Sequence, residues 1–312
     1  MKTILITGAS GFLGKHLLKI IGKNFNNQFE LVLLSSDKID GYHCIAHRGY
    51  TYSKNDFIIN GIDKIDIVIH LGGFSPRCFE DSDRCEENFS TIQNTQHLLN
   101  NLPNIPEAII LCSTITVYGD LSKSTNELDN MLINEETKPL PCNKYGLAKY
   151  CCELLVKEWA NKHSINYHIL RLTSLYGEND QRNQMINIMA KEAALGKNLT
   201  LTANPTIRRN IMYVDDCALF IYRLLIDQIE SGIINIVSSY NPSFEQIVDA
   251  IVDASNNSIV CKKPNDYVTV SNILFDATKR ETLLGFEEHN YVDGIKQLYE
   301  WYKNNTNKIK GD

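Results

Sequence analysis

Short apolar runs alternate along the chain with stretches in which apolar residues recur every three or four positions. Six of the runs lack the polar–apolar alternation of a half-exposed strand, and this predicts strands that are buried on both faces. They are "KTILITG" from residue 2, "ELVLLSS" from 30, "IDIVIHLGG" from 65, "AIILCSTITVYG" from 108, "INYHILRLTSLYG" from 165 and "GIINIVSS" from 232.

Helical periodicity marks two of the stretches between these runs. Residues 12–22 place Leu13, Leu17, Leu18 and Ile21 on one face and leave Lys15 and Lys19 for water. Residues 87–100 repeat the pattern with Phe89, Ile92, Leu98 and Leu99. Strand, helix and strand in succession predict right-handed crossovers, and therefore an α/β fold with a doubly wound parallel sheet.

The alternation weakens after about residue 175, which suggests a second, smaller region. We assign residues 1–172 together with 214–238 to the domain that contains the sheet. Residues 173–213 together with 239–312 are expected to form a smaller mixed α/β lobe.

Composition excludes several classes of protein. Of 312 residues, 43% are hydrophobic and 22% are charged, which is ordinary for a globular enzyme. The net charge is −6 and the chain has no basic run, so we do not expect nucleic acid as a partner. Nine cysteines without a CxxC pair indicate reduced, mostly buried thiols and no metal site. No segment resembles a signal peptide or a membrane helix, so we expect a cytoplasmic protein with no membrane partner.

Three glycines follow the first predicted strand in "TGASGFLG", at positions 8, 11 and 14. A strand that enters a glycine-rich turn and then a helix presents backbone N–H groups and the positive end of the helix dipole. Gly8, Gly11 and Gly14 also let a ligand approach the backbone closely. The turn therefore predicts a pyrophosphate site, although a tight turn alone would explain the same glycines.

A second group of polar residues follows the fourth of these runs. Tyr145 and Lys149 are four residues apart in a helical stretch, so both side chains project from one face. Thr114 ends a buried strand, at the sheet edge where open α/β folds bind ligands. We expect these three residues to belong to one site.

With these motifs the sequence resembles the extended short-chain dehydrogenase/reductases, in particular the nucleotide-sugar epimerase/dehydratase/reductase family. The resemblance covers nearly the whole chain, through "TGASGFLG", "VIHLGG", "STITVYG", "YGLAK", "LRLTSLYG", "RRNIMYVDD" and "INIVSS". It implies a Rossmann-type NAD(P)-binding domain and a substrate-binding lobe, and it implies a homodimer formed by the helices of Asn88 and Tyr145.

The resemblance also assigns roles to residues. It implies that Thr114, Tyr145 and Lys149 are catalytic. It places the cofactor against the following residues, in addition to Tyr145 and Lys149: Gly8, Ser10, Gly11, Phe12, Leu13, Gly14, Ser35, Ser36, Lys38, Leu71, Gly72, Gly73 and Asn88. It places a nucleotide-sugar substrate against Ser75, Thr116, Ser174 and Arg209.

The predicted trio suits the reduction of a ketone. A tyrosine hydroxyl can give a proton to the developing alkoxide, and a lysine beside it stabilises the phenolate that remains. Thr114 would hold the carbonyl oxygen. His70, which ends a strand, is interpreted as a structural histidine, and Asp215 and Asp216 are interpreted as helix caps.

Two departures from the family narrow the activity. NAD-specific members end the second strand with an acidic residue, whereas "ELVLLSSDK" has Ser35, Ser36 and Lys38, which favour the 2′-phosphate of NADP. NAD through Asp37, or a polar loop without selectivity, remains an alternative. Dehydratases carry an acidic pair after the catalytic threonine, where this chain has Ile115 and Thr116. Neither residue can act as an acid or base at neutral pH, so we do not expect dehydratase activity.

We therefore predict an NADP-dependent reductase of a nucleotide-activated 4-keto-6-deoxyhexose, in the synthesis of bacterial surface polysaccharide such as O-antigen. The main alternative is an NAD-dependent nucleotide-sugar 4-epimerase. A catalytically silent NADP-binding regulator is a third possibility, which the presence of both Tyr145 and Lys149 disfavours.

Overall fold

The computed structural model describes residues 1–24, 29–47, 51–78, 80–119, 131–227, 230–264, 266–267, 272–285 and 287–305. The chain divides into two compact units, each with its own core. The first unit comprises Met1–Gly119, Lys138–Leu172 and Ala218–Asn235, and the second comprises Asp120–Thr137, Thr173–Cys217 and Ile236–Asp312. The described residues 131–137 belong to the second unit, whereas the division drawn from the sequence has them in the first.

The first unit contains a seven-stranded sheet in the order β11-β7-β5-β4-β1-β2-β3. Its strands are β1 (Lys2–Thr7), β2 (Phe29–Ser35), β3 (His43–Ala46), β4 (Ile67–His70), β5 (Ala108–Thr114), β7 (Asn166–Leu172) and β11 (Gly232–Ile236). The pairings from β7 to β3 are all parallel. Chain order reverses at β1 and β4, and open α/β sheets bind ligands beyond the carboxyl ends of such strands.

The doubly wound α/β fold is confirmed, and each of the six predicted runs contributes one strand to this sheet, although residues 174–176 of the fifth run form a separate strand outside it. The seventh, β3, is a strand that the hydrophobic pattern missed. Its four residues, His43–Ala46, include just two apolar ones, Ile45 and Ala46, besides Cys44. It pairs along one side with β2, and edge strands need no continuous apolar run.

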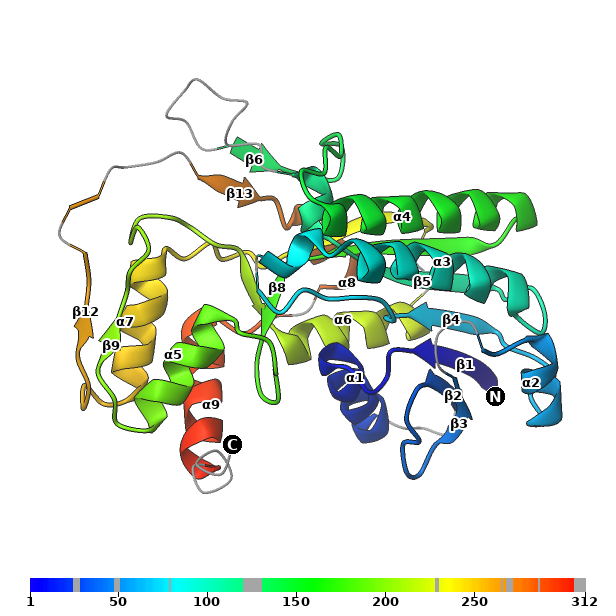
Figure 1. The fold of residues 1–312 in the computed structure, drawn as a ribbon, viewed down its shortest axis with the longest axis horizontal. Helices are drawn as coiled ribbons and strands as arrows, with labels where there is room; N and C mark the ends of the chain where they lie inside the picture. Colours follow the sequence, from blue (N-terminus) through cyan, green and yellow to red (C-terminus); the bar gives the residue numbers. More distant parts are fainter. Residues whose placement is uncertain are drawn as a thin grey trace. The chain divides into compact units, whose positions relative to one another are not determined.

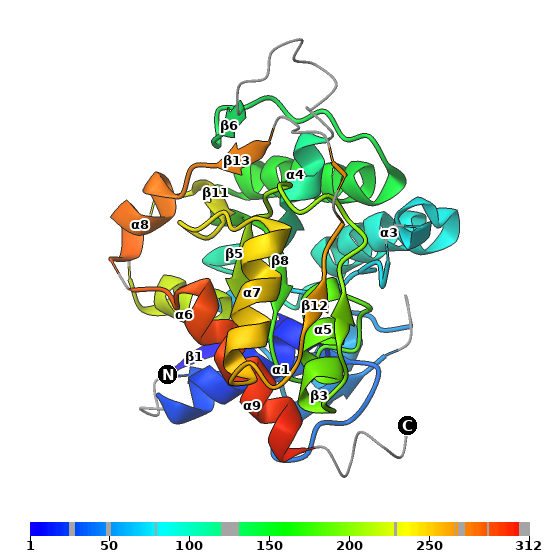
Figure 2. The ribbon, with the colours of Figure 1, turned by 90° about the vertical axis from the view of Figure 1, so that its left-hand side faces the viewer.

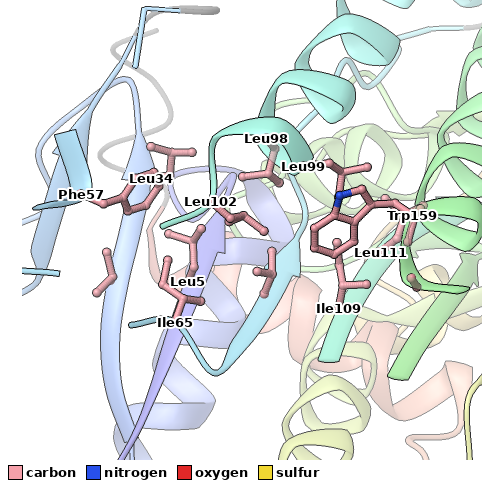
Figure 3. Packing of buried hydrophobic residues seen from close by; sticks show 14 of the residues in the cluster. Leu5, Leu34, Phe57, Ile65, Leu98, Leu99, Leu102, Ile109, Leu111 and Trp159 are labelled. Atoms are coloured by element: carbon pink, nitrogen blue, oxygen red, sulfur yellow. The ribbon is translucent and has the colours of Figure 1, made fainter. Parts of the chain in front are cut away.

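Helices cover both faces of the sheet (Figure 1). On one face lie α2 (Lys54–Ile59), α3 (Cys85–Asn101) and α4 (Lys144–His163), and on the other lie α1 (Phe12–Lys23) and the part of α6 (Val214–Ile226) from residue 218 onward. Figure 3 shows the core under the first three helices. There Leu98 and Leu99 of α3 and Trp159 of α4 pack with Ile109 and Leu111 of β5.

Two predictions about burial are wrong. Phe89 is 58% exposed, because α3 turns Asn88, Thr91 and Thr95 toward the interior together with its leucines. Hydrophobic periodicity alone does not detect a helix face that is partly polar. The thiols are not mostly buried: of the nine, those of Cys112, Cys152 and Cys217 are buried, three are half-buried and three are exposed.

The second unit has short parallel strand pairs and a helical core. Its strands pair as β10 (Ile211–Tyr213) with β8 (Ser174–Tyr176), β12 (Cys261–Lys262) with β9 (Leu199–Thr200), and β13 (Ile273–Phe275) with β6 (Met131–Ile133). The helices α5 (Met185–Ala194), α7 (Phe244–Ala254) and α9 (Tyr291–Asn304) share one apolar cluster and lie side by side in Figures 1 and 2. A shorter helix, α8 (Thr278–Leu284), precedes α9.

Across the described ranges of the chain, no helix combines the length and the apolar character needed to cross a membrane.

Candidate active site

The glycine turn brings the ends of β1 and β4 together. Gly8 has a φ of 70°, a conformation that favours glycine. A Cβ atom at Gly8 would lie 2.8 Å from the backbone nitrogen of Gly72, and one at Gly14 would collide with the carbonyl oxygen of Gly8. The glycines are therefore needed at these two positions because backbone packs directly against backbone.

The start of α1 is suited to an anion. Gly11 is its N-cap, no side chain caps the helix, and its first turn, which begins with Phe12 and Leu13, contains no acidic residue. Ser10 is half-buried immediately before it. Backbone N–H groups at such a helix start, next to a cradle of glycines, fit the pyrophosphate of a dinucleotide.

The turn after β4 is held by a chain of buried polar groups. Gly72 N donates to Thr7 Oγ1 at 3.0 Å, and Thr7 Oγ1 lies 2.7 Å from His70 Nδ1. His70 Nε2 lies 3.0 Å from Thr95 Oγ1, which itself donates to the carbonyl oxygen of Thr91 at 2.9 Å. Since the Thr95 proton is used there, Nε2 carries the proton of His70, and Nδ1 accepts from Thr7.

His70 is therefore a structural residue, as its position at a strand end indicated. Burial, with a smaller contribution from the charge of Lys149, lowers the pKa of His70 to about 3. The imidazole is neutral at physiological pH and bridges β1, β4 and α3. Leu71 and Gly73 flank the glycine that this bridge holds, and Ser75 lies exposed two residues further on.

Asn88 is 3% exposed and faces the chain that precedes its own helix. Its Nδ2 donates to the carbonyl oxygens of Ser82 at 3.1 Å and Arg84 at 2.6 Å. Among the described residues, its buried Oδ1 has no hydrogen-bond partner. Asn88 thus fixes the segment that leads into α3, and its predicted contact with the cofactor stays a prediction.

Lys149 is buried at the carboxyl end of the sheet. It is 6% exposed, and its Nζ donates to the carbonyl oxygen of Cys112 in β5 at 2.8 Å. A Cβ atom at Gly73 would lie 3.6 Å from the same Nζ. The ammonium group therefore lies beside the turn after β4, where the predicted cofactor-binding residues are.

The start of α4 places Tyr145 near the end of β5. Asn143 caps the helix, and its Oδ1 accepts from Gly146 N at 2.8 Å. A Cβ atom at Gly146 would lie 2.6 Å from the carbonyl oxygen of Thr116, so the helix packs directly on the short helix η2 (Ile115–Tyr118). Tyr145 is half-buried in the first turn of α4, one turn before Lys149.

Thr114 ends β5 with its hydroxyl group in a small hydrogen-bonded turn. Thr114 Oγ1 accepts from Thr116 N at 3.2 Å and lies 3.0 Å from Thr116 Oγ1. Thr114 and Lys149 both contact elements at the carboxyl end of the sheet, and Tyr145 precedes Lys149 on the same helix. The first unit thus supplies the whole predicted trio.

A buried ion pair lies one helical turn beyond Lys149, and the sequence reasoning missed it. Glu153 accepts from Arg171 Nη2 at 2.7 Å and from Ser113 Oγ at 2.5 Å, and the side chains of Glu153 and Arg171 are 3% and 2% exposed. Arg171 Nη1 also donates to Tyr118 Oη at 2.9 Å, and Tyr118 Oη donates to Asn235 Oδ1 at 2.8 Å. These bonds attach α4 to β5, β7 and η2.

The residues at the end of β2 divide into a buried one and two exposed ones. Ser35 is 3% exposed, and its Oγ lies 3.4 Å from Asp37 N, from which it accepts. Ser36 and Lys38 are exposed, and Ser36 Oγ donates to Asp37 Oδ2 at 3.2 Å. Ser36 and Lys38 are therefore the two predicted cofactor contacts that a ligand can reach from solvent here.

The second unit brings Ser174 and Arg209 to one pocket of about 180 Å³. Its other lining residues are mostly apolar: Leu175, Tyr176, Gln184, Met185, Ile186, Ile211, Phe244 and Ile247. Ser174 and Arg209 are both exposed. A serine and an arginine at the edge of an apolar pocket suit a ligand with an anionic group and a flat or aliphatic part.

Asp215 and Asp216 lie in the first turn of α6, as predicted for a pair at a helix start, but the carboxylate of Asp216 has a partner that the sequence did not indicate. That carboxylate accepts from His289 N at 3.0 Å and from His289 Nδ1 at 2.7 Å, so it ties α6 to the segment before α9. A capping pattern in the sequence does not reveal a partner that lies 73 residues further along the chain.

Comparisons with known proteins extend these observations. The NAD dependent epimerase/dehydratase family matches residues 4–236. A dTDP-D-glucose 4,6-dehydratase from Dictyostelium discoideum is 29% identical over 237 residues, but the match covers 69% of this chain and 54% of that protein, so the chain spans about half of its length. A GDP-6-deoxy-D-talose 4-dehydrogenase from Aggregatibacter actinomycetemcomitans is 25% identical, over 96% of this chain and 97% of its own. The structure of a UDP-N-acetylglucosamine 4-epimerase from Bacillus cereus superimposes with a TM-score of 0.74, 26% identity and 96% of each chain covered.

Proposed function

The chain belongs to the NAD-dependent epimerase/dehydratase family of extended short-chain dehydrogenase/reductases, and on that premise we propose that it reduces the C4 ketone of a nucleotide-activated 4-keto-6-deoxyhexose with NADPH. We further propose that its product serves the synthesis of bacterial surface polysaccharide such as O-antigen. The observation that carries the proposal is a complete Thr114, Tyr145 and Lys149 set next to Ile115 and Thr116, which cannot act as the acid and base of a dehydratase.

The chemistry divides among these residues. When bound, the reduced nicotinamide supplies the hydride that adds to C4. Tyr145 Oη gives its proton to the oxygen at C4, and the Lys149 ammonium group, held at Cys112, stabilises the phenolate that remains. Thr114 Oγ1 accepts from Thr116 N, and its proton, which can otherwise go to Thr116 Oγ1, would be donated to the same sugar oxygen when the substrate is bound.

NADPH is favoured over NADH by the end of β2. Positions 35 and 36 carry no carboxylate, whereas NAD-specific members of the family have an acidic residue at the end of this strand. Exposed Ser36 and Lys38 supply a hydroxyl group and a positive charge for that phosphate. Asp37 beside them is the residue that would support NAD instead, through a bond to the ribose hydroxyl groups.

The second candidate is a nucleotide-sugar 4-epimerase, which would use the same trio and keep its NAD bound. It is supported by the likeness to the Bacillus cereus epimerase. The reductase is supported by the GDP-6-deoxy-D-talose 4-dehydrogenase, whose name describes redox chemistry at C4 of a 6-deoxyhexose. The absence of an acidic residue at positions 35 and 36 favours the reductase, because recycled NAD is the cofactor of an epimerase.

Cofactor analysis separates the two candidates. The purified protein is denatured to release any bound nucleotide, and the native protein is mixed with NADPH or NADH and a panel of 4-keto-6-deoxy sugar nucleotides. We expect little retained NAD and net consumption of NADPH with at least one sugar. Retained NAD, together with interconversion of sugar nucleotides and no consumption of NADPH, would establish the epimerase.

A homodimer is part of the same proposal. Phe89 of α3 and Leu147 and Leu154 of α4 are 58%, 52% and 51% exposed, and the two helices lie side by side on the first unit (Figure 1). Exposed apolar side chains on paired helices suit a four-helix interface with a second copy of the chain. Light scattering is expected to report a dimer for the wild type and a smaller mass for Leu154→Glu, and a monomeric wild type at all concentrations would contradict the proposal.

A further inference from the structure

The backbone next to Arg209 forms a short antiparallel pair with the start of α7. Arg209 N donates to the carbonyl oxygen of Pro242 at 2.9 Å, and Phe244 N donates to that of Ile207 at 2.9 Å. Arg208 and Ser243 lie opposite each other between these two bonds. Side chains alternate between the two faces of such a pair, so adjacent Arg208 and Arg209 point in opposite directions.

The two arginines have different surroundings as a result. Arg208 Nη1 donates to the carbonyl oxygen of Asn241 at 2.8 Å, and Arg208 does not line the pocket. The guanidinium carbon of Arg209 lies 5.1 Å from the centre of the Phe244 ring, and both residues line the pocket of about 180 Å³. Arg209 Nη1 also donates to the carbonyl oxygen of Arg208 at 3.4 Å.

We propose that Phe244 is a positioning residue for the anionic part of the substrate: its ring holds the Arg209 guanidinium group at the edge of the pocket. This inference rests on the proposed function, in which Arg209 binds the diphosphate of a nucleotide sugar. An aromatic ring attracts the cation through its face and uses none of the five N–H donors of the guanidinium group. A bidentate bond to a phosphate needs two of those donors.

The ring is a firm support because its backbone is fixed on both sides. Phe244 is the first residue of α7, directly after a capping box in which Ser243 Oγ accepts from Gln246 N at 3.2 Å and Gln246 Oε1 accepts from Ser243 N at 2.9 Å. The bond from Phe244 N to Ile207 ties it to the arginine segment as well. An exposed arginine that is already oriented loses less conformational entropy when it binds its ligand.

The test measures binding without turnover. Phe244→Leu removes the ring and keeps an apolar side chain, and Phe244→Tyr is the matched control that keeps the ring. Titration calorimetry with UDP, GDP and dTDP gives the dissociation constant for each, and thermal unfolding checks that each variant is folded; Phe244→Met is used if the leucine variant is not. We expect Phe244→Leu to weaken binding of the preferred diphosphate about two- to fivefold, with Phe244→Tyr unchanged.

The substitution Phe244→Leu is also measured in a protein that carries Arg209→Gln. If Phe244 acts through Arg209, Phe244→Leu has no further effect on diphosphate binding once Arg209 is Gln, and NADPH binding stays unchanged in every variant. Three results would overturn the inference. Phe244→Leu could weaken diphosphate binding equally in both backgrounds, it could leave binding unchanged in the wild-type background, or none of the three diphosphates could bind. Because these titrations need no reaction, a protein that binds a diphosphate in this manner yet reduces no keto sugar would refute the reductase and keep the role of Phe244.

Discussion

The polar residues of the two units are held in opposite ways. In the first unit, Lys149 and the Glu153–Arg171 pair are almost fully buried, and each is bonded to neighbouring elements. In the second unit, Ser174 and Arg209 are exposed at the edge of an apolar pocket, and a ring supports the arginine. Groups that perform chemistry gain from a fixed position, whereas groups that recognise a substrate have to be reachable. Changes in the first unit should therefore alter turnover or stability, and changes in the second should alter KM.

The largest effect is expected at Tyr145. Tyr145→Phe removes the proton donor and keeps the ring, so kcat should fall about 10²- to 10⁴-fold while KM and the unfolding temperature change little. Tyr150→Phe, at a half-buried tyrosine of the same helix, is the control and should retain activity. Steady-state kinetics with a keto-sugar substrate measure both. If Tyr145→Phe turns over as fast as the wild type, the trio is not catalytic and the reading as a silent regulator regains support.

The buried ion pair tests the rigidity of the first unit. Glu153→Gln leaves the charge of Arg171 without compensation in a buried site, which should lower the free energy of unfolding by about 3–5 kcal/mol. Glu158→Gln changes an exposed residue of the same helix and should shift it by less than about 0.5 kcal/mol. Urea unfolding measures the difference. Equal stability of the two variants would mean that the pair does not hold α4.

Arg209 tests the exposed side of the comparison. Arg209→Lys keeps the charge but loses the bidentate geometry, and a lost charge-assisted bond of about 1.5–3 kcal/mol corresponds to a KM increase of roughly ten- to hundredfold. The dissociation constant of NADPH should not change, and Arg208→Lys should be close to the wild type, because Arg208 does not line the pocket. Weaker binding of NADPH with an unchanged KM for the sugar nucleotide would show that Arg209 belongs to the cofactor site.

The smallest effect is the pH dependence of stability. Burial is the main cause that lowers the pKa of His70 to about 3, and burial lowers the pKa of His168 to about 4. Below the ordinary pKa near 6.5 the unfolded chain binds protons that the folded chain does not, so stability is complete above that pH and falls as the pH decreases toward these values. Between pH 6.5 and 5.5 each histidine should lower the free energy of unfolding by about 1 kcal/mol, because the unfolded chain is only half protonated at the upper pH. Urea unfolding at pH 6.5 and 5.5 measures the slope. His70→Gln should reduce it, and an unchanged slope would contradict a neutral, buried His70.

Much of the first unit follows from local sequence. Six strands were predictable because buried parallel strands need long apolar runs, and the turn at Gly8 was predictable because backbone packing against Gly72 needs a glycine. The edge strand β3 was not, since one buried isoleucine, Ile45, produces no such run. The interior face of α3 was also missed in part, because its buried residues include Thr91 and Thr95, and polar residues do not contribute to hydrophobic periodicity.

Contacts between residues that are distant in the sequence could not be predicted either. Glu153 lies four residues after Lys149 on the same helix face, and Arg171 is a lone charge in an apolar strand, so both signals were present in the sequence. Their pairing depends on how α4 docks on β7, which local patterns do not specify. The ring of Phe244 under Arg209 likewise depends on a strand pairing between residues 35 positions apart, where the sequence carries no marker. The predicted division into a dinucleotide-binding domain and a substrate-binding lobe remains a prediction.

Transfer of deuterium is the most direct test of the central claim, which is that hydride passes from added NADPH to C4 of the sugar. NADPH deuterated at C4 of the nicotinamide ring is mixed with the protein and a 4-keto-6-deoxy sugar nucleotide, and the product is analysed by mass spectrometry and NMR. The account predicts one deuterium at C4 of the sugar for each NADPH oxidised, and no transfer with Tyr145→Phe. A product that has changed its configuration at C4 without acquiring deuterium, while the NADPH stays reduced, would contradict it.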